Sequence, residues 1–296
     1  MRFDAWHPAV NFIFFAAVIA SAVSFDQPVF LCVGFGSSLA YSLYLNKKRA
    51  AAFDTAMAIF VVVFTLFYSA YNHFGVTELG KNFAGNTMTL ESVVYGAVTA
   101  VKTATVLMWL FCMHQIVSSD KVIYLFGRIS PKFSLYLSIV FRTVPRIRAR
   151  FSSVNDARRG VGRGTGQGSL FRRAADRMKI FSIVVTWVIE TLAEAADSMK
   201  SRGYTLRGRT AFSIYRFDYR DRSFVLFMFL CVSILISGAL LDQTRTQYDP
   251  SIVINRITPL SFVFYAAYAL MCLAPMIVQI AGEAKFEWER RSVDVR

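Results

Sequence analysis

Long apolar segments alternate with short polar ones along this chain, a pattern typical of helices that cross a membrane. Six of these segments have about the length needed to span a hydrocarbon core of ~30 Å. We place them at 9–25, 29–45, 52–72, 92–117, 223–241 and 258–281. A tight turn at Asp26 and Pro28 joins the first two, which predicts a helical hairpin. The sequence therefore predicts an all-α membrane protein with about six transmembrane helices.

Shorter apolar runs lie between the fourth and fifth segments. The runs at 133–144 and 180–192 are too short to span a bilayer, but long enough for buried or interfacial helices. From the second run onward, apolar and polar residues repeat with helical spacing, which predicts a long amphipathic helix. The apolar face would carry Val188, Leu192, Ala195 and Met199, and the polar face Glu190, Glu194, Asp197 and Ser201.

These patterns divide the chain into three parts. Residues 1–117 are expected to hold about four transmembrane helices, and residues 118–222 a region of long amphipathic helices. Residues 223–296 are expected to hold about two transmembrane helices and a polar tail.

The long amphipathic helix has a predicted end at Ser201-Arg202-Gly203. Glycine suits the position just after a helix, and an arginine in the last turn complements the helix dipole. Upstream, GVGRGTGQG at 160–168 has glycine at every second position, but it lacks GxxxxGK[ST] and does not complete GxGxxG. We therefore predict a flexible turn between two helices here, and no nucleotide-binding loop.

Basic residues are concentrated in one part of the chain. The formal net charge is +14, and residues 142–222 contain 18 basic and 7 acidic side chains, which is 11 of those 14 charges. Further basic residues follow the second predicted span, at Lys47, Lys48 and Arg49. The turn at 26–28 and the loops at 73–91 and 242–257 carry few. The positive-inside rule then places both termini and the basic region in the cytoplasm of a cell-membrane protein.

Such a basic region could attract nucleic acid, anionic lipid or an acidic protein. A nucleic-acid partner normally requires a soluble basic domain, and here predicted spans flank the region on both sides. We therefore expect membrane lipid or acidic protein partners, and no nucleic acid.

No group of residues in the sequence predicts a catalytic or metal site. The four cysteines lie in apolar runs without metal-ligand or CxxC spacing, and the three histidines are scattered. No nucleophile with a base and an orienting group can be assembled. We expect a protein that is not an enzyme and binds no cofactor or metal.

Two charged residues fall inside predicted spans. Lys102 could mark a substrate or ion pathway, because a cation is costly in the membrane core. With no obvious acidic partner inside the spans, we favour a packing role in which Lys102 bonds a backbone carbonyl or reaches the surface. Asp54, near one end of the third span, is expected to stay hydrated.

Arg202 allows two interpretations. Its guanidinium could enter an acidic groove of a partner protein and pair with a carboxylate through two hydrogen bonds. It could equally complement the helix dipole or bind a lipid phosphate. Physical reasoning alone favours neither.

A resemblance bears on this choice. The segment ADSMKSRGYTLRGRTAFS, residues 196–213, resembles the second cytoplasmic motif of the transmembrane T component of energy-coupling factor (ECF) transporters. Residues 119–150, with Arg142 and Pro145, resemble the preceding family segment, and HPAVNFIFF is similar to the start of a subgroup. The residues that match the second motif are Ala196, Asp197, Met199, Arg202, Gly203, Tyr204, Gly208, Arg209 and Thr210.

The first family motif, an Ala-Arg-Gly-like sequence, is matched less well. Asn155-Asp156-Ala157-Arg158-Arg159-Gly160 stands in its place, with Arg158 where the family has its central alanine. Arg159 is our choice for the first docking arginine, with Arg158 in reserve, and Arg163 could take the same role if the helix register differs.

The resemblance implies a non-catalytic subunit of an ATP-driven importer. Two ATP-binding cassette (ABC) ATPases would dock on the arginine-bearing helix ends, at Arg158, Arg159 and Gly160 and at Ser201, Arg202 and Gly203. Asp197, Tyr204, Gly208 and Arg209 would support these coupling helices. A membrane-embedded substrate-binding S component would capture a vitamin or a transition-metal ion, and the apolar runs 133–144 and 180–192 are its natural surface.

Two other functions remain open from the residues. A self-contained secondary transporter would require repeats and ionisable residues at mid-membrane. A membrane scaffold would use the basic region to bind anionic lipid.

Overall fold

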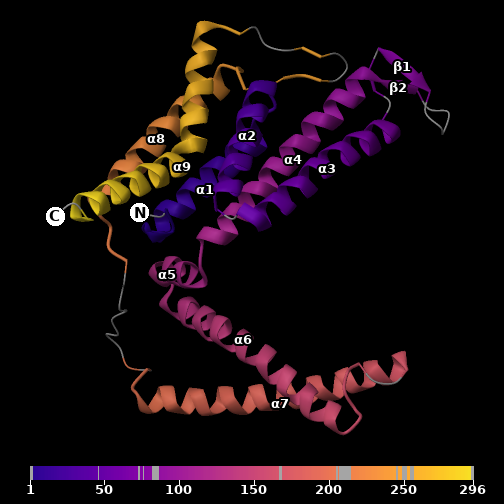
Figure 1. Cartoon of the computed structure of the whole chain (residues 1–296), viewed down its shortest axis with the longest axis vertical. Helices are drawn as coiled ribbons and strands as arrows, with labels where there is room; N and C mark the ends of the chain where they lie inside the picture. The colour runs from indigo at the N-terminus through magenta and orange to yellow at the C-terminus, as the bar shows by residue number, and fades with distance from the viewer. Residues whose placement is uncertain are drawn as a thin grey trace. The chain divides into compact units, whose positions relative to one another are not determined.

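The chain folds as two compact units, Met1–Ser118 with Tyr215–Arg296, and Ser119–Ile214 (Figure 1). The computed structural model describes residues 3–45, 47–72, 74–75, 77–81, 87–166, 169–204, 206, 215–244, 246–248, 252–253 and 257–294. Within these residues the chain is mostly α-helical, so the predicted all-α class is confirmed, while the number of transmembrane helices stays a prediction.

The first unit contains the long apolar helices. Its elements are the short 3₁₀ helix η1 (Phe3–Ala5) and the α-helices α1 (Pro8–Ser24), α2 (Pro28–Leu45), α3 (Lys47–Tyr71), α4 (Leu90–Ile116), α8 (Tyr219–Leu240) and α9 (Pro259–Asp294). Among the described residues, α2, α3, α4, α8 and α9 are long and apolar enough to cross a membrane, while α1 is also apolar but has only 17 residues. The chain is therefore a membrane protein, and the number of crossings stays a prediction.

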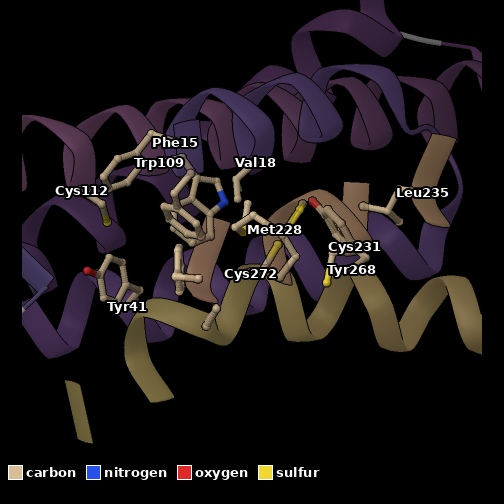
Figure 2. Close-up of a cluster of buried hydrophobic side chains, with 14 of the residues drawn as sticks. Phe15, Val18, Tyr41, Trp109, Cys112, Met228, Cys231, Leu235, Tyr268 and Cys272 are labelled. Atoms are coloured by element: carbon tan, nitrogen blue, oxygen red, sulfur yellow. The ribbon is translucent and has the colours of Figure 1, made fainter. Parts of the chain in front are cut away.

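Helix α4 lies at the centre of this unit and packs against α1, α2 and α3, while α9 packs against α2 and α8. Trp109 of α4 is fully buried among aromatic rings, with centroids 5.8 Å from Phe14, 6.3 Å from Phe15 and 6.0 Å from Tyr41. Figure 2 shows this core, in which side chains from α1, α2, α4, α8 and α9 meet. Cys112, Cys231 and Cys272 lie in it as buried free thiols, as the apolar runs predicted.

The polar segment after α3 contains strand structure that the sequence analysis did not predict. Strands β1 (Glu78–Lys81) and β2 (Thr87–Thr89) form an antiparallel pair. The Glu91 carboxylate, buried at the start of α4, accepts hydrogen bonds from the backbone N–H and the hydroxyl of Thr77. This carboxylate ties the segment to α4, a contact that no helical periodicity could reveal.

Lys102 has an acidic partner, contrary to our expectation. Its Nζ lies 2.6 Å from Oδ1 of Asp26, in the turn between α1 and α2. The backbone carbonyl of Asp26 also accepts a hydrogen bond of 2.7 Å from the Tyr248 hydroxyl. Burial raises the pKa of Tyr248, so its hydroxyl remains protonated and can donate. The sequence search missed this pair because Asp26 lies in a turn outside the spans.

Asp54 is also placed differently from our expectation, because it is buried and not hydrated. Only 6% of the residue is exposed, and the hydroxyl of Ser42 on α2 donates to its Oδ1 at 2.9 Å. Asp54 faces α2 and not water, which depends on how the two helices pack and cannot be read from either segment alone.

The described part of the second unit consists of three helices, α5 (Ser119–Ile129), α6 (Pro131–Gly160) and α7 (Leu170–Ser201). Helix α5 was not predicted, although Pro131 marks its boundary with α6. Neither α6 nor α7 is among the helices that are apolar enough to cross a membrane, as their short apolar runs predicted. The two helices run antiparallel and cross one another (Figure 1), and we call them the α6–α7 hairpin.

We predict that Lys102→Met lowers the stability of the first unit by roughly 1 kcal/mol, because it leaves Asp26 without its cation. Thermal unfolding of the full chain in detergent would measure the loss. In the double variant Lys102→Met/Asp26→Asn the loss should be smaller than the sum of the two single losses. Additive losses would show that the two side chains do not interact.

Candidate functional site

The C-terminus of α7 has the cap that its sequence predicted. Arg202 is the C-cap, and Gly203 follows with φ +75°, a left-handed conformation that glycine adopts without strain. The Gly203 N–H donates to the Lys200 carbonyl at 3.0 Å, and the Tyr204 N–H to the Met199 carbonyl at 3.1 Å. These two bonds form a Schellman motif, which ends the helix at a defined point and leaves the Arg202 side chain exposed.

The C-terminus of α6 has the same motif, but at a different glycine. Gly160 is the last helical residue, and Gly162 takes the left-handed conformation with φ +70°. The Gly162 N–H donates to the Arg159 carbonyl at 3.1 Å, and the Arg163 N–H to the Arg158 carbonyl at 2.9 Å. Gly162 is therefore the capping glycine of α6.

The two Arg-Gly pairs consequently occupy different positions in their helices. Arg202 is a C-cap residue, whereas Arg159 lies two positions before the C-cap of α6. A side chain at Gly160 would meet nothing within 4 Å. The local sequence resemblance between the two pairs does not extend to their backbone geometry.

Arg158 is committed to a contact inside the hairpin. Its Nη2 lies 2.9 Å from Oδ1 of Asp176 on α7, and its Nε donates to the Arg163 carbonyl at 3.3 Å. The side chains of Arg158 and Asp176 are only 20% and 8% exposed. This ion pair joins the end of α6 to the start of α7, so Arg158 is not available to a partner without breaking it.

Arg159 lies beside Arg158 but is exposed. Its side chain lies close to Gly164, where an added Cβ would approach Arg159 Cγ to an impossible 2.0 Å. The loop is also held to α6 because the N–H and hydroxyl of Thr165 both donate to Asn155 Oδ1 at 3.0 Å. The expected turn thus lies between the helices, and contacts from α6 hold it.

The other predicted site residues are distributed as follows. Ser201 is the last residue of α7 and is exposed. Asp197 is also exposed and lies 3.5 Å from Lys200, a surface pair of small energetic effect. Tyr204 is 40% exposed. Gly208 and Arg209, together with Thr210, lie outside the described residues.

A groove of about 330 Å³ lies between the N-terminal half of α6 and the C-terminal half of α7. The four residues of the predicted apolar face of α7 all line it, together with Arg202 and Tyr204. The predicted polar face, with Glu190, Glu194, Asp197 and Ser201, is exposed. The amphipathic pattern therefore identified both faces of α7 correctly.

Outside the groove, both helices expose apolar side chains. On α6 they follow helical spacing at Phe133, Tyr136, Val140 and Val144, and Tyr136 is 65% exposed. On α7 they lie at Met178, Phe181, Val185 and Ile189, and Ile189 is 63% exposed. Apolar stripes of this length on exposed helices are typical of surfaces that contact another protein or lipid.

The hairpin combines charged and apolar side chains on its surface. Among the described residues, no group of three or more His, Cys, Asp or Glu side chains could hold a metal ion. What the hairpin offers is exposed guanidinium groups beside two fixed helix ends, and apolar stripes on both helices. Sequence reasoning missed Asp176, Gly162 and Gly164, because their roles depend on the pairing of α6 with α7.

We predict that Arg158→Gln destabilises the α6–α7 hairpin by roughly 3 kcal/mol, because it leaves the buried Asp176 carboxylate unpaired. Hydrogen exchange of α6 and α7 amides in the full chain would measure the effect. Arg159→Gln is the matched control and should change the same exchange rates little. Similar effects of the two variants would contradict a special role for Arg158, while partial rescue by Asp176→Asn would support it.

A second prediction separates the capping glycines from the helical one. Gly203→Ala should destabilise the end of α7 by about 1 kcal/mol, because a Cβ is unfavourable at this positive φ. Gly160→Ala should be neutral or stabilising, because its backbone is helical and unobstructed. Amide exchange at the two helix ends tests both, and equal fraying after both substitutions would contradict the assigned caps.

Comparison with known proteins adds no relative to this picture. A scan against protein-family models gives no match to the chain, and a search of curated proteins gives none either. The fold and the site therefore show a mostly helical membrane protein with a basic helical hairpin that exposes apolar stripes.

Proposed function

We propose that this chain is the energy-coupling transmembrane subunit of an energy-coupling factor transporter. In this role it is not an enzyme. It transmits the ATP-driven motion of two ABC ATPases to a membrane-embedded S component that takes up a vitamin or a transition-metal ion. The S component selects the substrate, and the ATP is bound and hydrolysed by the partner ATPases.

The observation that carries the proposal is the position of the two exposed arginines. Arg159 lies at the closed end of the α6–α7 hairpin, beside the loop that joins the helices, and Arg202 at the far end of α7. Helix α7 has 32 residues, and at ~1.5 Å per residue it is about 48 Å long. Two docking points separated by roughly this distance suit two separate subunits better than one.

Each docking point is supported by the backbone beside it. Capping bonds fix the last turn of α6 and α7, so a force on either arginine is transmitted along a helix and not lost in a frayed end. The Arg158–Asp176 ion pair links the helices near the first docking point. Because Arg158 is occupied in this contact, we assign docking at that end to Arg159, with Arg163 as its exposed neighbour.

The S component is proposed to contact the exposed apolar stripes of α6 and α7. A partner that is itself embedded in lipid needs an apolar surface to bind, and these stripes remain exposed in the folded chain. The remaining helices would anchor the subunit through six crossings of the cell membrane. Both termini and the basic region would lie in the cytoplasm, in accordance with the positive-inside rule.

We predict that Arg202→Glu, and separately Arg159→Glu, abolishes or strongly weakens capture of the ATPases by the full chain. Charge reversal would replace an attractive contact with carboxylates by repulsion, a change worth several kcal/mol in an interface. Co-purification from cells that express the chain with the ATPase pair of its own organism would measure the loss. Arg177→Glu, at an exposed arginine of α7 that belongs to neither docking motif, is the matched control.

The double variant Arg159→Glu/Arg202→Glu is the decisive sample. If it captured the ATPases and supported uptake like the unaltered chain, docking through these arginines would be disproved. Uptake of substrate by the purified chain alone in liposomes would instead support a secondary transporter. For that alternative, Lys102 and its partner Asp26, in the turn between α1 and α2, are the charged pair to substitute.

A further inference from the structure

The groove between α6 and α7 concentrates positive charge. Arg142 and Arg146 line it from α6, where their spacing of four residues puts them on one face. Arg202 lines it from the end of α7. No acidic side chain lines the groove, and no carboxylate of the described residues lies within ion-pair distance of these three arginines. Three like charges in one groove repel one another until an anion occupies it.

Hydroxyl groups stand among these charges. Ser138 and Thr143 line the groove from α6, and Ser198 from α7. Their hydroxyls make no hydrogen bond to any described residue, so they are free to donate to an anion. Guanidinium groups together with hydroxyls form the donor set that phosphate oxygens require, since each oxygen accepts charge-assisted hydrogen bonds.

The rest of the groove is apolar. Leu135, Ile139, Val188 and Leu192 form part of its wall, next to the exposed apolar stripes of both helices. Trp187 also lines it, and the Arg150 guanidinium lies over the Trp187 ring at 5.2 Å from the centroid, a cation–π contact. Tryptophan and arginine are both frequent where a protein meets the polar boundary of a bilayer.

We propose that this groove is a binding site for an anionic phospholipid. The phosphate of its headgroup lies between Arg142, Arg146 and Arg202, and an acyl chain follows the apolar wall toward the stripes. A phospholipid combines a charged phosphate and apolar acyl chains in one molecule, and phospholipids surround every membrane protein. An acidic protein segment would match the arginines but would have to supply the apolar part from separate side chains. The inference does not depend on the proposed transporter function.

The test uses the full chain, purified in detergent, with native mass spectrometry to count bound lipids during titration. Phosphatidylglycerol should bind more tightly than the zwitterionic phosphatidylcholine. Arg142→Gln/Arg146→Gln should weaken phosphatidylglycerol binding about tenfold or more, because two of the three cations are lost. Arg148→Gln/Arg177→Gln, which removes two exposed charges from the same helices outside the groove, should leave binding nearly unchanged.

Three results would overturn the proposal. Equal weakening by both double variants would mean diffuse attraction of lipid to a basic surface. Binding of inorganic phosphate with the affinity of phosphatidylglycerol would mean a site for free phosphate, in which the apolar wall has no part. Loss of ATPase capture by Arg142→Gln/Arg146→Gln with unchanged lipid binding would make the groove a protein-docking site. The separate Arg159→Glu experiment, at an arginine that does not line the groove, reports on the transporter function, so the two failures can be told apart.

Discussion

A guanidinium from the end of α6 and a carboxylate from the start of α7 meet at 2.9 Å, and both are largely removed from water. Removing either charge alone would leave the other buried and unpaired, which is far more costly than losing a surface pair. The Arg158–Asp176 contact therefore fixes how the two helices leave their loop. From that point, the antiparallel course of α6 and α7 determines which side chains face one another, including those that line the groove.

The same contact separates arginines that look equivalent in sequence. Arg158, Arg159 and Arg163 lie within six residues, yet only the first is held inside the hairpin. The capping bonds of Gly162 then set where α6 ends, just as Gly203 does for α7. The exposed arginines thus lie beside well-defined helix ends, while Arg158 forms an ion pair inside the hairpin. Under the proposed function, this division lets the hairpin bind partners at both ends without losing its own rigidity.

The sequence predicts the features that depend on residues close together in the chain, and it misses those that depend on contacts between distant residues. The apolar helices, the two faces of α7 and the end of α7 at Gly203 depend on residues within a few turns, and they were predicted. The Lys102–Asp26 pair joins residues 76 positions apart, and the buried environment of Asp54 depends on Ser42 of another helix. Asp176 as the partner of Arg158, and the capping role of Gly162 in place of Gly160, likewise required the folded hairpin.

Arg202 links the two proposals physically, because a single guanidinium lies both at the α7 end and in the groove. A phosphate bound beside it would neutralise part of the charge that a partner's carboxylate needs. By thermodynamic linkage, a lipid that weakens docking at Arg202 must itself be bound more weakly by the docked complex. Arg159 does not line this groove, so a lipid bound in it would act on only one of the two docking points. This asymmetry follows from where the capping glycines and the arginines lie along the α6–α7 hairpin, and it requires no additional conformational change.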